Sequence, residues 1–186
     1  MDGIEKRRHV GRHAQNARKT IIDAAEDLVI GAGVRHLTLD AVAAKAGVSK
    51  GGLLYHFPNK QALLNAMLDR RVARVEQRRQ EKLALLPEGQ KSAIAAYVLS
   101  VLERDERANK LAVALLAAVV HDPHLLVPYQ KEFKQRIDEF CGEGLSFERA
   151  AVIMLAATGL SFLELFSLFP FTGNERNRIV EKIITL

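Results

Sequence analysis

A segment near the amino end carries the residue types that contact DNA. One predicted short helix would expose Ser49, Lys50, Gly51, Gly52, Leu54, Tyr55 and His56 on a single face. Cations and small hydroxyls bind phosphate, and a lysine can also hydrogen-bond to guanine. Gly51 and Gly52 are poor helix formers, which suits a backbone that approaches DNA closely, although ordinary helix connections also contain glycines. We therefore expect this face to lie in a DNA major groove.

Two predicted helices position that face. Thr38 would cap the first helix, with Asp40 in its first turn, and Ser49 would cap the second. Gly47 lies between them and can adopt the left-handed conformation that a sharp turn needs. Two short helices joined by such a turn form a helix-turn-helix.

The remainder of the chain is also predicted to be helical. Residues 1–15 are polar and basic without periodicity, so we expect a mobile arm there. A first amphipathic helix then carries Ile21, Ala25 and Val29 and ends near Gly33. Apolar residues at helical spacing, interrupted by Gly and Pro, predict further helices over residues 59–86, 90–104, 107–120, 124–143, 147–169 and 174–186. The expected fold class is all-α.

Residues 18–64 resemble the DNA-binding domain of the TetR/AcrR family of transcriptional regulators. The resemblance rests on two strings, LDAVAAKAGVSKG at residues 39–51 and LLYHFPNKQAL at residues 53–63. It implies that Thr38 contacts a phosphate through its hydroxyl and helix-end amide, and that Lys60 clamps another. Leu54 departs from the family, which often has an aromatic residue there. Leucine can contact a thymine methyl but cannot donate a hydrogen bond.

The composition of the arm and the resemblance together predict a division into three parts. These are the arm at 1–15, a helix-turn-helix DNA-binding domain at 16–64 and a helical effector-binding and dimerisation domain at 65–186. The family's C-terminal helices enclose a ligand cavity, and the scarcity of charge here predicts a hydrophobic or aromatic effector. The candidate lining residues are Tyr97, Val101, Leu115, Val119, Phe133, Ile137, Phe140, Cys141, Leu155, Gly159 and Phe162. Each of them also fits a plain core position.

A long apolar segment near the carboxyl end has two interpretations. Residues 150–171 contain one charged residue, Glu164, and their number alone permits a membrane span. Their polar residues and the lack of other spans favour a helix buried at a subunit interface. Small residues would let such helices pack closely. We therefore expect no membrane association and a homodimer formed through 147–169 and 174–186, as the resemblance also implies.

The charge is concentrated at one end. Residues 1–80 carry a net charge of +7 and residues 81–186 carry −2, which gives the total of +5. This distribution predicts a polyanionic partner for the amino-terminal part, although the excess would also serve solubility alone. A sequence-independent architectural DNA-binding protein would need broader basic coverage.

No pattern of catalytic residues is present. The sequence lacks a Gly-x-Ser-x-Gly motif, a P-loop, a His-Glu-x-x-His motif and a Gly-rich dinucleotide loop. Cys141 is the single cysteine, and one thiol in an apolar helix is more often a packing residue than a nucleophile. The string from His121 to His124 fits a helix end better than a metal site. We expect no enzyme activity, no metal and no cofactor.

Together these observations predict a cytoplasmic, homodimeric regulator that binds double-stranded DNA. One cysteine and no secretory signal favour a reducing compartment. The expected activity is repression, released from a palindromic operator by a small-molecule effector. An activator of the same fold is the alternative, and an architectural protein is a weaker one.

Overall fold

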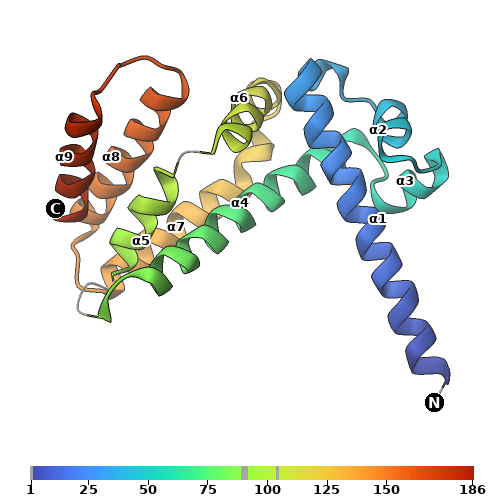
Figure 1. The fold of residues 1–186 in the computed structure, drawn as a ribbon, viewed down its shortest axis with the longest axis horizontal. Helices are drawn as coiled ribbons and strands as arrows, with labels where there is room; N and C mark the ends of the chain where they lie inside the picture. Colours follow the sequence, from blue (N-terminus) through green and yellow to red (C-terminus); the bar gives the residue numbers. More distant parts are fainter. Residues whose placement is uncertain (1, 89–91, 104) are drawn as a thin grey trace. The chain divides into compact units, whose positions relative to one another are not determined.

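The computed structural model describes residues 2–88, 92–103 and 105–186 (Figure 1). Every regular element within those ranges is helical, which confirms the predicted all-α class. In the same ranges no helix combines the length and apolar character that crossing a bilayer requires. Three residues of the predicted helix over residues 90–104, Gln90, Lys91 and Arg104, lie outside the described residues, as does Gly89 of the predicted break.

The chain divides into two compact units. Unit 1 consists of Met1–Asp69 and Lys110–Leu125, and unit 2 consists of Arg70–Asn109 and Leu126–Leu186. The sequence predicts boundaries after residues 15 and 64. The contacts differ from that prediction, because they group Lys110–Leu125 with the amino-terminal part of the chain.

Unit 1 contains the helix-turn-helix. Its elements are α1 (Asp2–Ala32), the 3-10 turn η1 (Val34–His36), α2 (Leu39–Ala46), α3 (Lys50–His56) and the beginning of α4 (Lys60–Leu85). Helix α1 packs against η1 and α2, and α2 packs against α3 (Figure 1). The apolar side chains between them are buried: Ile21, Ala25, Val29, Leu37, Val42, Leu53, Phe57, Leu63 and Met67.

The amino end differs from the sequence prediction. Helix α1 begins at Asp2, so residues expected to form a non-helical arm belong to this helix. Arg, Lys, Glu, Gln and Ala are good helix formers even without an apolar stripe, which is the signal that periodicity detects. The helix ends where predicted, and Gly33 follows it with a φ of 84°.

Helix α6 (Glu106–His121) and the 3-10 turn η3 (Pro123–Leu126) follow later in the chain. The part of α6 from Lys110 onward belongs to unit 1. There the Gln61 side-chain amide on α4 donates a hydrogen bond of 2.6 Å to the Asp122 carboxylate. A direct hydrogen bond therefore joins the start of α4 to Asp122, the residue that follows α6.

Unit 2 is a helical bundle made of the rest of α4 with α5 (Ala93–Val101), α7 (Val127–Gly142), α8 (Phe147–Leu165) and α9 (Gly173–Ile184). Helix α8 packs against α5, α7 and α9 (Figure 1). The core contains Tyr97, Val98, Phe140, Ala150, Ile153, Met154, Ala157 and Ile183. Helix α7 begins at Val127 rather than at 124, because the preceding residues form η3.

The apolar segment at 150–171 is tied to its neighbours through its one charge. The Arg176 guanidinium on α9 donates to the Glu164 carboxylate at 2.5 Å and to the Leu102 carbonyl at 2.6 Å. Thr172 begins α9 with a capping box, and its backbone and hydroxyl groups lower the pKa of Glu175. The contact between Arg176 and Glu164 thus adds to the packing of α8 against α5, α7 and α9.

Candidate nucleic-acid interface

Side-chain caps fix the starts of α2 and α3. The Ala41 amide donates to the Thr38 hydroxyl oxygen at 3.2 Å, and the Gly52 amide donates to the Ser49 hydroxyl oxygen at 3.1 Å. Gly47 ends α2 in the left-handed conformation, with φ 68° and ψ 29°. The predicted caps and turn are confirmed, and they orient the two helices from local sequence alone.

The two helices bury one face and expose the other. Val42 of α2, with Leu53 of α3 and Phe57 after it, lies in the core of unit 1. Lys50 and Tyr55 are exposed, the latter at 82% of its surface, and Leu54 is exposed at 38%. His56 is half-buried, and its ring meets the Tyr55 ring edge-on at 5.1 Å. The face predicted to meet DNA is therefore accessible to a large partner.

The two glycines of α3 differ in their surroundings. A Cβ added to Gly52 would lie 3.2 Å from the Ser49 hydroxyl oxygen, so this glycine makes room for the cap. A Cβ added to Gly51 would meet nothing within 4 Å. No neighbour among the described residues therefore requires glycine at position 51.

Further cations of unit 1 lie on α1, α2 and α4. The Lys60 ammonium at the start of α4 donates to the Val34 carbonyl at 3.1 Å. An ammonium has three donors, so this bond leaves capacity for a phosphate. The Arg18 guanidinium lies 5.3 Å from the centroid of the Phe57 ring, which is cation–π geometry. Lys45 and Lys19 are exposed.

One contact at this face is not predicted from the sequence. The sequence indicates only that Asp40 lies in the first turn of its helix, where it interacts favourably with the helix dipole. The Lys50 ammonium lies 2.9 Å from the Asp40 carboxylate, and the two side chains are 62% and 71% exposed. The ion pair links the first turns of α2 and α3. Opposite charges ten residues apart gave no periodic signal, because the intervening turn sets their distance.

A helix-turn-helix followed by a helical bundle is the arrangement of a class of DNA-binding regulatory proteins. Known protein families of that class match both parts of the chain. Residues 21–67 match the model for bacterial regulatory proteins of the tetR family, and residues 91–186 match a tetracyclin repressor-like C-terminal domain. The second match alone covers more than half of the chain. The chain belongs to the TetR family of transcriptional regulators.

Individual relatives agree with this assignment. The regulator SrpR of Pseudomonas putida is 41% identical over 61 residues, which are 33% of this chain and 29% of SrpR. Matches to four such curated relatives span 29–46% of their lengths. A TetR-family structure from Streptomyces coelicolor superposes with a TM-score of 0.73 at 21% identity, over 91% of this chain and 99% of that one. The structure of the multidrug-binding protein EbrR complexed with imidazole superposes with a TM-score of 0.70 at 21% identity. The superposition covers 91% of this chain and 95% of EbrR.

The predicted effector-lining residues are not brought together. Leu115 and Val119 belong to unit 1, whereas the other nine belong to unit 2. Tyr97 and Phe140 are buried and meet edge-on at 5.6 Å, with Val101, Ile137 and Cys141 packed around the same core. These five residues share one region, the hydrophobic core of unit 2.

The remaining four residues of unit 2 require a correction. Leu155, Gly159 and Phe162 lie on an exposed face of α8, and Phe133 is exposed on α7. Their exposure contradicts the prediction that they line an interior cavity of one protomer. The prediction failed because helical spacing alone does not distinguish a buried stripe from an exposed one. An open groove of about 810 Å³ along α9, lined in part by Phe169, Phe171 and Ile179, contains none of the eleven predicted residues.

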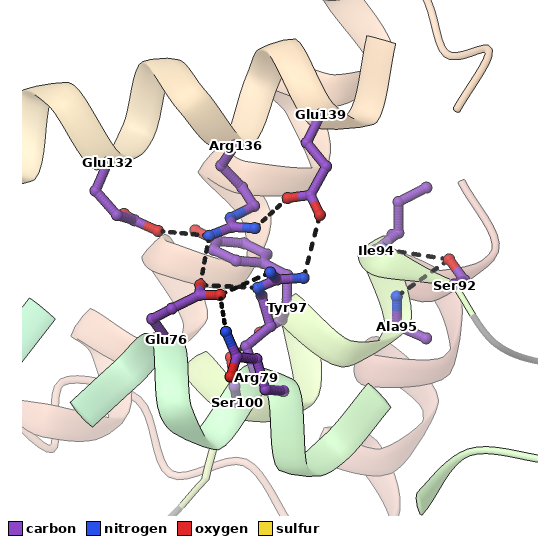
Figure 2. Close-up of polar contacts among 11 residues, drawn as sticks. Glu76, Arg79, Ser92, Ile94, Ala95, Tyr97, Ser100, Glu132, Arg136 and Glu139 are labelled. Carbon is purple, nitrogen blue, oxygen red and sulfur yellow. Dashed lines mark hydrogen bonds and ion pairs between the residues drawn. The ribbon is translucent and has the colours of Figure 1, made fainter. Parts of the chain in front are cut away.

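A cluster of five charged residues in unit 2 was not predicted (Figure 2). Arg136 of α7 is buried and donates to Glu76 of α4 at 2.8 Å, to Glu132 at 3.4 Å and to Glu139. Arg79 of α4 donates two hydrogen bonds to Glu76, at 2.8 and 2.9 Å, and one to Glu139 at 3.2 Å. The charged cluster thus joins α4 to α7.

The charges within the cluster shift one another's titration. Hydrogen bonding from Arg79 holds the pKa of Glu76 at about 2, against an ordinary value of 4.5. Burial raises the pKa of Glu132, whose one hydrogen bond in the cluster is the long contact with Arg136. Burial also raises the pKa of nearby Tyr97 to about 12. Glu76 is therefore the best-compensated acid of the cluster, and Glu132 is less well compensated.

Proposed function

We propose that the chain is a homodimeric, sequence-specific DNA-binding transcriptional regulator that responds to a small-molecule effector. The observation that carries the proposal is the exposed face of α3, where Lys50 and Tyr55 project from a helix whose other face is buried. Thr38, Ser49 and Lys60 border that face with groups that bind phosphate. Membership of the TetR family supports the same activity.

The mode of binding follows from the motif. Helix α3 enters the major groove, and Lys50, Tyr55 and His56 face base edges or phosphates. Two copies related by a two-fold axis place their α3 helices in successive grooves of a palindromic operator. The centres of the two half-sites then lie about one helical turn apart, roughly 34–36 Å.

The exposed face of α8 is the proposed dimer surface. Val152, Leu155 and Phe162 are exposed large apolar residues with successive spacings of three and seven, and Gly159, four residues after Leu155, lies on the same stripe. A glycine there lets a second helix approach closely. A second copy of the chain that packs its own 147–169 and 174–186 against this face would bury the stripe in a four-helix arrangement.

The effector acts through α4 in this proposal. That helix is continuous from Lys60 to Leu85, and it contributes residues to both units. A ligand that favours one arrangement of unit 2 would change the spacing of the two α3 helices. Coupling of about 1–3 kcal/mol would weaken operator binding by roughly 5–150-fold. EbrR, whose fold is similar, is a multidrug-binding protein, which supports a small-molecule effector for this chain.

A gel-shift assay tests DNA binding. Wild-type protein would first enrich a duplex from a random-sequence pool, and its affinity for that duplex would be compared with its affinity for a shuffled duplex. We expect a clear preference for the enriched sequence. Equal affinities would favour an architectural protein, and failure to bind either duplex would contradict the proposal.

Tyr55→Ala tests whether α3 is the contact surface. Because Tyr55 is exposed, we expect weaker DNA binding with an unchanged circular dichroism spectrum and unchanged thermal unfolding. A collapse of the fold would show that Tyr55 has a structural role instead.

Transcription in the cell distinguishes a repressor from an activator. A strain in which the gene is deleted would show higher transcription of the target for a repressor and lower transcription for an activator.

Leu155→Lys tests the dimer surface. A charge placed in the centre of an apolar interface should convert the dimer to a monomer, as light scattering would measure after size exclusion. Leu85→Lys is the matched control, because Leu85 is an exposed leucine of unit 2 on a different helix. If both variants stay dimeric, copies of the chain associate through another face.

A further inference from the structure

We propose that Asp40 is a positioning residue of the DNA-binding surface, which holds Lys50 away from DNA phosphates and so lowers the affinity for non-operator DNA. The inference rests on the proposed DNA-binding function and adds a residue that sets its specificity. It assigns to Asp40 a role toward Lys50 that differs from stabilising its own helix.

The charge pattern singles out Asp40. It is the only acidic residue between Asp27 and Asp69, a stretch that contains Arg35, Lys45, Lys50 and Lys60. A surface that only attracted phosphate would carry no exposed carboxylate in contact with one of its cations. Asp40 nevertheless follows Thr38 by two residues and is exposed beside the start of α3.

The geometry pairs this acid with a cation of the recognition helix. The Lys50 ammonium and the Asp40 carboxylate are 2.9 Å apart, and both are exposed to solvent. The caps at Thr38 and Ser49 and the left-handed Gly47 fix the backbones that carry the two side chains. Folding therefore places the two charges within contact distance before any DNA is bound.

The pair distinguishes two kinds of DNA contact. Phosphates are present on every duplex, so a free Lys50 would add one sequence-independent contact everywhere. A phosphate that approaches Lys50 also approaches the Asp40 carboxylate, and repulsion between the two anions weakens the ion pair or the phosphate contact. At an operator, a guanine within reach offers two acceptors and compensates for the lost ion pair. Asp40 thus penalises non-operator DNA more than operator DNA.

The test is Asp40→Asn in the full-length chain. The probes are the duplex enriched by wild-type protein and its shuffled counterpart, each measured over a series of salt concentrations. On the shuffled duplex we expect about two- to fivefold tighter binding, the size of an exposed ion pair. The slope of log affinity against log salt should steepen there by about 0.9, since one more phosphate contact forms. Affinity for the enriched duplex should change less, so the specificity ratio falls.

Two controls make the result decisive. Asp69→Asn, an equal charge change at an exposed residue of α4, should leave the salt slope unchanged. In a Lys50→Gln background, Asp40→Asn should lose its effect, because its partner is absent. An unchanged slope in the single variant, or an undiminished effect in the Lys50→Gln background, would overturn the proposal. A merely structural role would shift thermal unfolding without moving the slope. Wild-type protein that binds neither duplex would contradict the proposed function itself, before any variant is measured.

Discussion

The α2–α3 surface of unit 1 and the charged cluster of unit 2 use charge in opposite ways. Lys50 and Asp40 are exposed and make one contact with each other. Arg136 is buried and donates to three carboxylates of two helices. An exposed pair exchanges its partner at small cost, whereas a buried guanidinium that loses its partners pays a large desolvation penalty. The first arrangement suits binding of an outside polyanion, and the second holds helices together.

This comparison predicts that variants of the two regions affect different measurements. Changes in the cluster should lower the free energy of unfolding and leave the affinity for DNA of the folded protein unchanged. Changes to the exposed side chains of the α2–α3 surface, namely Asp40, Lys50 and Tyr55, should do the reverse. The predictions that follow test this separation.

Arg136→Met should give the largest effect on stability. The variant leaves Glu76, Glu132 and Glu139 without their shared cation, and the guanidinium it removes is buried. Because the carboxylates are partly exposed, we expect a loss of about 2–4 kcal/mol rather than the full cost of a buried pair. Urea unfolding measures it. Lys134→Met removes an exposed cation from the same helix and should change stability by less than about 0.5 kcal/mol. Equal losses in the two variants would contradict the role of the cluster.

Gly47→Ala should give the next largest effect. Gly47 has a φ of 68°, which costs a residue with a Cβ roughly 1–2 kcal/mol. A Cβ there would meet nothing within 4 Å, so the loss would come from the backbone conformation alone. Gly31→Ala is a control of opposite sign, since Gly31 is exposed within α1 and Ala is the better helix former. Thermal unfolding should show a lower midpoint for the first variant and a higher one for the second.

The turn at Gly47 and the cluster around Arg136 also differ in how well the sequence predicts them. Thr38, Gly47 and Ser49 act on backbone groups a few residues away, so their types and spacing predicted the caps and the turn, and the structure confirms them. Arg136 binds Glu76 across 60 residues, and no local pattern reports such a contact. The exposed stripe of α8 has the same spacing as a buried one, so Leu155 was assigned to a cavity. Helix α1 extends through residues 2–15, where helix propensity without amphipathicity gave no periodic signal.

As the pH falls, the charged cluster should lose the stability that Glu76 contributes. The pKa of Glu76 is about 2 in the folded protein and about 4.5 in its ordinary state, so its contribution is complete above pH 4.5 and is lost as the pH falls toward 2. Glu76 is one-third exposed, and solvent screening reduces this contribution to about 1 kcal/mol. Burial of Glu132 acts with the opposite sign, because its raised pKa favours the protonated folded form and its contribution is lost as the pH rises.

Unfolding measured at a series of pH values checks this. The free energy of unfolding of wild-type protein should fall more steeply below pH 4.5 than that of Glu76→Gln. Glu132 acts above about pH 4.5 instead, where its raised pKa makes the wild-type protein gain stability as the pH falls, and Glu132→Gln should lack that gain. If Glu76→Gln has the wild-type slope, other carboxylates account for the acid sensitivity.

Lys60→Ala should have the smallest effect on stability and a specific effect on binding. Its exposed hydrogen bond to the Val34 carbonyl is local, so unfolding should change by less than about 0.5 kcal/mol. If Lys60 also binds a phosphate, affinity should fall equally for enriched and shuffled duplexes, and the salt slope should become shallower by about 0.9. Lys131→Ala, an exposed lysine of unit 2, should leave that slope unchanged. A loss of stability without a change in slope would assign Lys60 to the turn at Val34, so this residue shows most directly whether an exposed cation of unit 1 serves the fold or the partner.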